Sequence, residues 1–309
     1  MEFPSPWALP PGSAGKVVCG STAKRRQASA LQKPRSRPFP CYPSGVRALD
    51  LPETPRHVLS FDFDGTLHDP AQSPPVSDAF FRKIAELRAN ESVVWGINTG
   101  RSMEHVIEGM IESRFPFAPD WVVARERELW FPNAVGRWVG DDEWNRRCEK
   151  EHRKFFRKVR RRMKAIRAEV EEHTGAQWVE EAGDPAGLIA RTEEEMEWIV
   201  GRVRELAADE PLLGWQRNTI YLRFGHRNYQ KGSSLNRVAE GYGLGPADCF
   251  AIGDSHNDFE MLSPGAAARI ACPANAVPEI RAHVVAVGGH VCIAAHSDGC
   301  VEAMERFFG

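Results

Sequence analysis

The sequence predicts an α/β fold, in which a Rossmann-like parallel sheet core is interrupted by an inserted α+β domain. Three observations lead to this prediction. Short apolar runs alternate with amphipathic helical segments, an order typical of parallel sheets with helical crossovers. Several apolar runs end abruptly at turn residues such as Asp64-Gly65-Thr66. Between two such alternating parts, residues 142–225 follow a different order, αββαββ, which indicates a separate inserted domain.

The first alternating part begins near His57, where an apolar run reads as a short buried strand. The helix after it has apolar residues on one face and Ser77 as an expected N-cap. The expected elements are strands at 58–63, 92–97, 121–131 and 137–139, and helices at 77–89 and 102–113.

The inserted part and the second alternating part follow in the same manner. The inserted part is expected to contain helices at 142–173 and 193–208 and strands at 176–181, 187–191, 212–216 and 218–224. After it, a helix is expected at 231–241, a strand at 249–252 and a short helix at 258–262.

The composition divides the chain into regions. Residues 1–55 are rich in Pro, Ser, Arg and Gly and carry eight Lys or Arg against three Asp or Glu. Such a segment buries too little apolar surface to offset its ordering entropy, so we expect a disordered N-terminal extension. The catalytic core is expected at 56–141 and 226–309, and the inserted domain at 142–225.

Bulk properties exclude some classes of protein. The net charge of -2 argues neither for nor against a polyanionic partner for the chain as a whole. No apolar run approaches the ~18 residues that span a bilayer, and the N-terminus lacks the apolar segment of a signal peptide. The seven cysteines form no CxxC pair, which disfavours a zinc site of the common kind. We therefore expect reduced thiols and a cytoplasmic protein without a membrane partner.

The most informative segment is Asp62-Phe63-Asp64-Gly65-Thr66, at the end of the first expected strand. Alternate side chains of a strand point the same way, so Asp62 and Asp64 are expected close together. Two clustered carboxylates repel each other unless a cation lies between them, and Mg²⁺ is commonly bound by one or two carboxylates with phosphate oxygens. The segment indicates a metal site, although the same pattern also occurs in turns and calcium loops.

Two further residues carry groups suited to an anion. Thr99 follows an expected strand, and its hydroxyl and the neighbouring N–H groups suit a phosphoryl oxygen. Taken alone, Thr99 equally suits a helix N-cap. Lys231 begins an expected helix, where its ammonium suits a transferred phosphoryl group. A single surface lysine is otherwise usually solvated.

A second acidic segment, Gly-Asp-Ser-His-Asn-Asp at 253–258, follows the expected strand at 249–252. It offers Asp254 and Asp258, four residues apart, together with the amide of Asn257. This spacing again suits a metal, and the alternative is an acidic turn with a helix N-cap. Ligands of open parallel sheets bind at the carboxyl ends of the strands, which is where these segments fall.

Taken together and in order, four segments resemble the haloacid dehalogenase (HAD) superfamily. They are Asp62-Phe-Asp64-Gly-Thr-Leu, Thr99-Gly-Arg, Lys231-Gly and Gly253-Asp254-Ser-His-Asn257-Asp258.

The resemblance implies a role for each residue. Asp62 is the expected nucleophile, which forms an aspartyl-phosphate, and Asp64 is the expected general acid, which then activates water. Thr99 and Lys231 are expected to hold the phosphoryl group. The remaining phosphate-binding positions are Gly65, Gly100, Arg101 and Asn257. Mg²⁺ is the expected cofactor. The expected metal residues are Asp62, Asp64 (through its carbonyl), Asp254 and Asp258. Asp258 and Asn257 are expected to complete the metal shell or to orient Lys231.

The resemblance also narrows the activity. Dehalogenases of this superfamily need no second aspartate, so Asp64 favours a phosphatase or a phosphomutase. An inserted αββαββ domain resembles the C2B cap of Cof-type and sucrose-phosphatase-like members. We therefore expect a phosphomonoester hydrolase acting on a small phosphorylated metabolite, with a sugar phosphate as the first candidate and a phosphosugar mutase as the alternative. Residues 124–127, Ala-Arg-Glu-Arg, depart from that branch's usual glycine-threonine-glutamate stretch.

One basic segment suggests a function of another class. Residues 146–167 contain twelve Lys or Arg and two Glu, while Phe155, Val159, Met163 and Ile166 recur at helical spacing on one face. The cationic face is expected to be solvated or to steer anionic substrates. Nucleic-acid binding through this helix is the third alternative, disfavoured because no aromatic residues interleave with the cations on the polar face.

Overall fold

The computed structural model describes residues 50–133, 135–179 and 186–309. Eight strands form one sheet in the order β12-β11-β10-β1-β2-β3-β4-β5. The strands from β12 to β3 pair in parallel, whereas β4 and β5 are antiparallel. The strands are β12 (His290–Val291), β11 (Arg269–Cys272), β10 (Cys249–Ile252), β1 (His57–Phe61), β2 (Val93–Asn98), β3 (Trp121–Ala124), β4 (Glu128–Pro132) and β5 (Trp138–Gly140).

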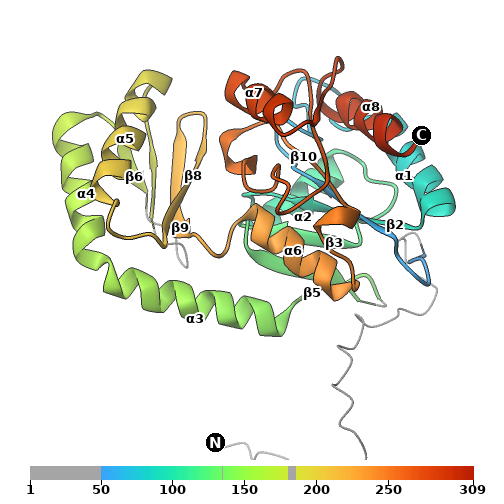
Figure 1. Cartoon of the computed structure of the whole chain (residues 1–309), viewed down its shortest axis with the longest axis horizontal. Helices are drawn as coiled ribbons and strands as arrows, with labels where there is room; N and C mark the ends of the chain where they lie inside the picture. Colours follow the sequence, from blue (N-terminus) through green and yellow to red (C-terminus); the bar gives the residue numbers. More distant parts are fainter. Residues whose placement is uncertain (1–49, 134, 180–185) are drawn as a thin grey trace, which may run out of the picture. The chain divides into compact units, whose positions relative to one another are not determined.

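Helices cover both faces of this core sheet (Figure 1). Because neighbouring strand residues point to opposite faces, Val58 belongs to one buried cluster and Leu59 to the other. The first cluster includes residues of α6 and α7, and the second includes residues of α1, α2 and α8. The helices are α1 (Asp78–Glu91), α2 (Met103–Glu112), α6 (Lys231–Gly241), α7 (Pro278–Ala286) and α8 (His296–Phe308). Short 3-10 helices, η1 (Pro246–Asp248) and η2 (His256–Asp258), flank β10.

The inserted part forms a separate antiparallel sheet, which we call the cap sheet, in the order β6-β7-β9-β8. Its own apolar cluster packs between this sheet and its helices. Figure 1 shows α3 running from the core sheet to the cap. The predicted fold class is therefore confirmed. The elements are α3 (Asp142–Lys158), α4 (Arg160–His173), β6 (Gln177–Val179), β7 (Gly187–Ile189), α5 (Glu193–Leu206), β8 (Leu213–Asn218) and β9 (Tyr221–His226).

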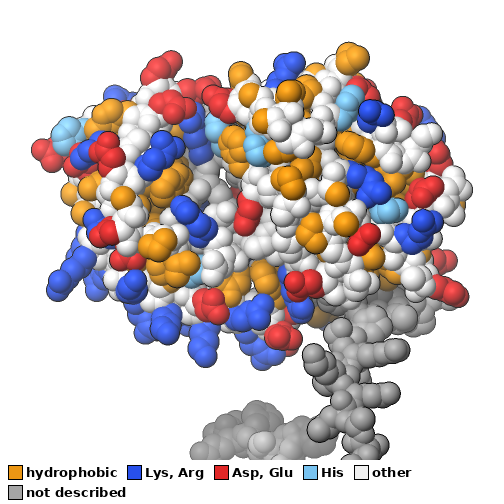
Figure 2. Space-filling view, viewed as in Figure 1, with side chains coloured by type: hydrophobic (Ala, Val, Ile, Leu, Met, Phe, Trp, Pro, Cys, Tyr) orange, Lys and Arg blue, Asp and Glu red, His pale blue; other side chains and the backbone are white. Residues whose placement is uncertain are grey.

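The predicted basic helix has the expected two faces. Phe155, Val159 and Ile166 are buried in the cap cluster, and Met163 packs against it. The cations face outward, and Figure 2 shows Lys and Arg side chains along the edge formed by α3. The single helix predicted at 142–173 is wrong, however, because Val159 separates α3 from α4 with φ -88° and ψ 10°. Val159 itself is buried at this break.

The strand predicted at 121–131 is also wrong, since the structure divides it into β3 and β4. Arg125 and Glu126 form the turn between them and adopt positive φ angles of 49° and 64°. Their N–H groups donate to Arg101 and Thr99 carbonyls, each at 2.8 Å. These distant backbone partners fix a turn that contains neither Gly nor Pro.

Smaller differences concern single elements and the chain start. The short helix predicted at 258–262 is a 3-10 helix at His256–Asp258. The expected disordered extension lies outside the described residues, apart from residues 50–55. In the described part of the chain, no helix is long and apolar enough to cross a membrane.

Candidate active site

The predicted site residues gather at one edge of the core sheet. β1 lies between β10 and β2, and all three run parallel, so their carboxyl ends are neighbours. Asp62 directly follows β1, Thr99 follows β2, and Asp254 lies two residues beyond β10. This is the edge at which open α/β sheets bind ligands.

A buried lysine contacts two carboxylates at the centre of this edge. The Nζ of Lys231, at the first residue of α6, lies 2.5 Å from Asp62 Oδ1 and 2.7 Å from Asp258 Oδ1. Burial alone lowers the pKa of Lys231, but the carboxylates of Asp258 and Asp62 outweigh it, so the pKa is raised. Burial raises the pKa of Asp62 well above its usual value, against the opposing attraction of Lys231. Lys231 is therefore held as a cation beside the expected nucleophile.

Asp258 and Asp254 form a second layer around this pair. The second oxygen of Asp258 accepts from the backbone N–H groups of Asp254 and Ser255, each at 3.0 Å. Thr66 donates its hydroxyl to Asp254 Oδ1 at 2.7 Å. Burial, followed by repulsion from Asp258, raises the pKa of Asp254 to about 6. Both oxygens of Asp258 thus already have donors, and one of these donors is Lys231.

Oxygen ligands for a cation are present at this site. One carboxylate oxygen each from Asp62, Asp254 and Asp258 lies within 4.8 Å of the others. The donor set is all oxygen and strongly anionic, which fits Mg²⁺ rather than a softer metal. Asp258 is the least available of the three as a metal ligand, because both of its oxygens already accept hydrogen bonds.

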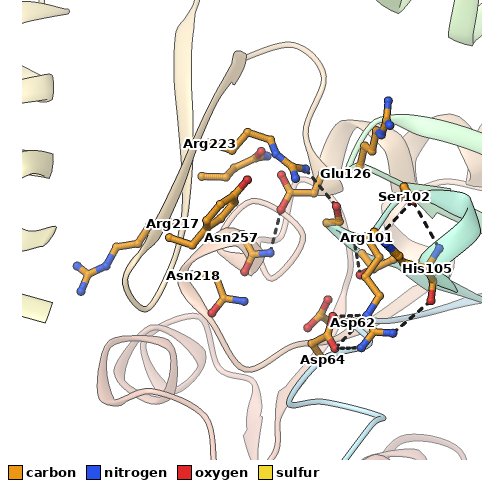
Figure 3. A pocket seen from close by; sticks show the side chains of 15 residues that line it. Asp62, Asp64, Arg101, Ser102, His105, Glu126, Arg217, Asn218, Arg223 and Asn257 are labelled. Carbon is orange, nitrogen blue, oxygen red and sulfur yellow. Dashed lines mark hydrogen bonds and ion pairs between the residues drawn. The ribbon is translucent and has the colours of Figure 1, made fainter. Parts of the chain in front are cut away.

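Asp64 faces Arg101 in this structure (Figure 3). The Arg101 Nε and Nη2 donate to the two Asp64 oxygens at 2.8 and 2.5 Å, a bidentate arrangement. The guanidinium also lies 4.7 Å from the centre of the Phe63 ring. Gly109 of α2 leaves room for it, since a Cβ there would lie 2.7 Å from Arg101 Nη1. Asp64 is therefore held at the mouth of the site, with its side chain partly exposed.

A cavity of about 370 Å³ opens above these residues and is lined by both the core and the cap. The cap contributes Gln216 and Asn218 from β8 and Tyr221 and Arg223 from β9. Gln216 pairs with Arg223 and Asn218 with Tyr221 in the register of this hairpin, so all four lie on one face of the cap sheet. Arg223 reaches the core, where its Nη1 donates to the Gly100 carbonyl at 3.1 Å. The predicted site residues that line the cavity are Asp62, Asp64, Thr99, Gly100, Arg101 and Asn257.

The remaining predicted residues lie below or beside the cavity. Lys231, Asp254 and Asp258 contact Asp62 or the acidic layer under it, and Gly65 packs against Asp254. The Asn257 Nδ2 donates to Glu126 Oε1 at 2.9 Å, and the ammonium of Lys231 is held by Asp62 and Asp258.

Sequence reasoning missed Glu126 as a site residue. Glu126 is 4% exposed and lines the cavity, in the turn that interrupts the predicted strand at 121–131. From the sequence, the candidate specificity residues of the cap are Glu180, Arg191, Trp215 and Arg217. Arg217 lines the cavity, whereas Arg191 forms a surface ion pair with Glu195. Glu180 lies outside the described residues.

The fold and the site define a capped α/β protein. At the carboxyl ends of its parallel strands, a buried lysine lies among several carboxylates. The model of the haloacid dehalogenase-like hydrolases matches residues 134–303, which is more than half of the chain. The chain therefore belongs to the haloacid dehalogenase-like hydrolases, and the resemblance inferred from its four motifs is confirmed.

Two curated relatives are both named phosphoglycolate phosphatase. A phosphoglycolate phosphatase of Methanothermobacter thermautotrophicus is 44% identical over 79 residues, which span 26% of this chain and 33% of the relative. A phosphoglycolate phosphatase of Natronomonas pharaonis is 31% identical over 168 residues, spanning 44% of this chain and 72% of the relative. The chain thus matches about a third of the first relative's length.

Solved structures share the fold. The sucrose-phosphatase of Synechocystis sp. PCC6803, in complex with sucrose and phosphate, superposes with a TM-score of 0.61 at 15% identity, covering 82% of this chain and 98% of that one. The HAD subclass IIB sugar phosphatase BT4131 gives a TM-score of 0.54 at 16% identity, covering 81% and 98%. The cap sheet thus belongs to a shared architecture.

Proposed function

We propose that this protein is a Mg²⁺-dependent phosphomonoester hydrolase that works through an aspartyl-phosphate on Asp62. The observation that carries the proposal is the buried contact between Lys231 and Asp62, next to further carboxylates at the sheet edge. A structural ion pair alone would not need a cavity above it, yet Asp62 also lines the cavity. The arrangement supplies a nucleophile, a fixed cation and oxygen ligands at one point.

The residues divide the reaction into two displacements. In the first, an Asp62 oxygen bonds to phosphorus while the bond to the leaving alcohol breaks, and Asp64 gives that alcohol its proton. In the second, Asp64 takes a proton from water as the water oxygen attacks phosphorus, and the bond to Asp62 breaks to release phosphate. Asp64 lies at the cavity wall, where it can serve both steps.

Charge on the phosphoryl oxygens is balanced by the chain in both displacements. Lys231 provides a fixed ammonium, and the Thr99 hydroxyl and the following loop line the cavity beside Asp62. We propose Asp62 and Asp254 as ligands of Mg²⁺, with the Asp64 carbonyl. Mg²⁺ would lower the pKa of Asp62 and neutralise phosphoryl charge. Preformed charges of this kind suit phosphoryl transfer, in which positioning and electrostatics dominate.

The substrate we propose is a small phosphorylated metabolite, with a sugar phosphate as first candidate. A cavity of about 370 Å³ between core and cap suits a small molecule and not a polymer. The named relatives and fold neighbours point to two kinds of leaving group, the glycolate of phosphoglycolate and the sugar of a sugar phosphate.

The test is phosphate release with Asp62→Asn. With Mg²⁺ and p-nitrophenyl phosphate, we expect kcat/KM to fall at least about a thousandfold, since Asn cannot form the acyl phosphate. Asp78→Asn, an exposed carboxylate at the start of α1, is the control and should keep wild-type activity. Undiminished phosphate release by Asp62→Asn would contradict the proposal.

A further inference from the structure

Three polar side-chain atoms of the cavity wall have no hydrogen-bond partner within the described residues. They are Glu126 Oε2, Asn257 Oδ1 and Gln216 Nε2, and all are buried from solvent. Buried polar atoms are usually paired in native proteins, so each unpaired atom calls for an explanation. All three residues line the same cavity, and this points to a ligand that supplies the missing partners.

Glu126 is fixed in place from several sides. Its backbone N–H donates to Thr99 at 2.8 Å, and its carbonyl accepts from the Ser234 hydroxyl at 3.0 Å. Its Oε1 accepts from Asn257 Nδ2 at 2.9 Å, whereas Oε2 has no partner in the described part of the chain. The residue adopts φ 64°, a conformation that non-glycine residues rarely take and that the packing must support. Glu126 is thus a rigid acceptor, and Figure 3 shows it joined to Asn257.

The facing wall comes from the cap. Gln216 lies on the face of the β8–β9 hairpin that also carries Asn218 and Tyr221, and these three side chains line the cavity. They are neutral and polar, with both donor and acceptor atoms. A molecule between Glu126 and Gln216 therefore lies near the unpaired oxygens of Glu126 and Asn257 on the core side, and near donor and acceptor atoms on the cap side.

The arginines around the cavity do not indicate a second anion on the substrate. Arg101 is paired with Asp64, Arg217 with Glu197, and Arg125 lies 3.7 Å from Glu128. Arg223 donates to the Gly100 carbonyl. Their charges thus face acceptors of the chain itself, whereas the unpaired atoms of the wall include two oxygens that need donors.

We propose that Glu126, Asn257 and Gln216 form a hydroxyl-recognition site that selects phosphate esters of polyols over phosphate esters of hydroxy acids. A hydroxyl is both donor and acceptor, so neighbouring hydroxyls satisfy all three atoms. A carboxylate offers acceptors only, and its charge is repelled by Glu126. The inference rests on the proposed phosphatase function and names the leaving group for that same site.

The experiment compares three small phosphate esters, with p-nitrophenyl phosphate as a fourth, general substrate, using the full chain and Mg²⁺. Glycerol 1-phosphate and n-propyl phosphate share a carbon chain and differ in hydroxyls, while phosphoglycolate carries a carboxylate. The variants are Glu126→Gln, Gln216→Leu and, as a matched control, Glu128→Gln, which removes a carboxylate two residues away that does not line the cavity. Circular dichroism checks that each variant is folded, and phosphate release gives kcat/KM.

We expect the wild type to prefer glycerol 1-phosphate over n-propyl phosphate by at least about 100-fold, because the deoxy analogue leaves buried polar groups unpaired. Glu126→Gln and Gln216→Leu should each narrow this ratio about tenfold, the effect of losing one hydrogen bond to the substrate. Glu128→Gln should leave the ratio as it is.

Three results overturn the hydroxyl-recognition site. They are a wild-type ratio near one, a higher kcat/KM for phosphoglycolate than for glycerol 1-phosphate, and a ratio narrowed by Glu128→Gln as much as by Glu126→Gln. Phosphate release from p-nitrophenyl phosphate but from none of the three small esters also overturns the hydroxyl-recognition site, while the proposed phosphatase function stands. Release from none of the four esters overturns both.

Discussion

The ammonium of Lys231 lies 2.5 Å from Oδ1 of Asp62, and neither side chain is exposed by more than a few per cent. A second carboxylate, that of Asp258, shares the same ammonium at 2.7 Å. The three groups form one buried unit, in which the ammonium offsets the charge of both carboxylates. Buried charges that lose their partner are strongly destabilising, whereas exposed pairs contribute little.

Lys231→Met is expected to lower the free energy of unfolding by about 3–5 kcal/mol, because it leaves Asp62 and Asp258 facing each other without a cation. Urea denaturation at neutral pH, with chelator present, measures this loss. The control is Lys158→Met, which removes an exposed lysine paired with Glu210 and should change stability by less than about 1 kcal/mol. Equal effects of the two substitutions would show that Lys231 is not a structural charge.

Asp254→Asn is expected to raise the Mg²⁺ concentration for half-maximal phosphate release at least about tenfold, as loss of a metal-shell group typically does. Asp254 accepts the Thr66 hydroxyl at 2.7 Å, so the amide can keep the local structure while losing the charge. Titration of chelated protein with Mg²⁺ measures the change. Asp209→Asn on the cap surface, where the carboxylate pairs with Arg162, should leave the requirement as it is.

The core of the site was predictable from sequence because its residues directly follow apolar strands. Asp62, Thr99 and Asp254 come at the ends of β1, β2 and β10, and the parallel order of these strands brings the ends together. The rule that relates strand ends to ligand sites needs only local patterns and the right-handed crossover. No knowledge of side-chain contacts is required for this part.

Other features depend on contacts between distant segments, which a local pattern does not contain. The turn at Arg125 and Glu126 is held by carbonyls of Arg101 and Thr99, so nothing nearby marks it. The pairing of Asp64 with Arg101 likewise joins residues 37 positions apart. For the same reason, Gln216 is recognised as a cavity residue only from the register of β8 with β9.

Gly65→Ala is expected to weaken Mg²⁺ binding as well as stability. Gly65 has φ 78°, and a Cβ there would lie 2.5 Å from Asp254 Oδ2. Its carbonyl is held by Asn275 Nδ2 at 2.7 Å and by the His296 ring, so the loop cannot easily move away. The Asp254 carboxylate must therefore shift, which raises the Mg²⁺ concentration needed for activity.

Gly243→Ala is the matched control for that substitution. Gly243 has φ 76°, but a Cβ there meets nothing within 4 Å. Both variants should lose about 1–2 kcal/mol of stability from the left-handed backbone, while only Gly65→Ala should change the Mg²⁺ requirement. Thermal denaturation and Mg²⁺ titration separate the two effects. A Mg²⁺ requirement that is unchanged in both variants would contradict the assignment of Asp254 to the metal.

A pH-dependent contribution to stability is expected from Asp120, far from the acidic centre in sequence. Its Oδ2 accepts from the Trp95 N–H at 2.9 Å and from Arg88 Nη2, in a position that is almost fully buried. Burial outweighs the attraction of Arg88 and raises the pKa of Asp120 to about 6. In the unfolded chain the pKa of Asp is about 3.9. Between pH 4 and 6 the folded state therefore binds more protons than the unfolded state, so this contribution is present at low pH and is lost as the pH rises through 6.

Asp120→Asn removes that titration and keeps a side chain of the same shape. The wild-type free energy of unfolding minus that of Asp120→Asn is expected to fall by about 2–3 kcal/mol as the pH rises from 4 to 7, and to level off above it. Urea denaturation of both proteins across this range gives the difference, in which all other titrating groups cancel. Asp78→Asn, which is exposed, should show no such slope. A difference that grows with pH would mean that Arg88 holds the pKa of Asp120 below its unfolded value, and the buried ion pair would then outweigh its own desolvation.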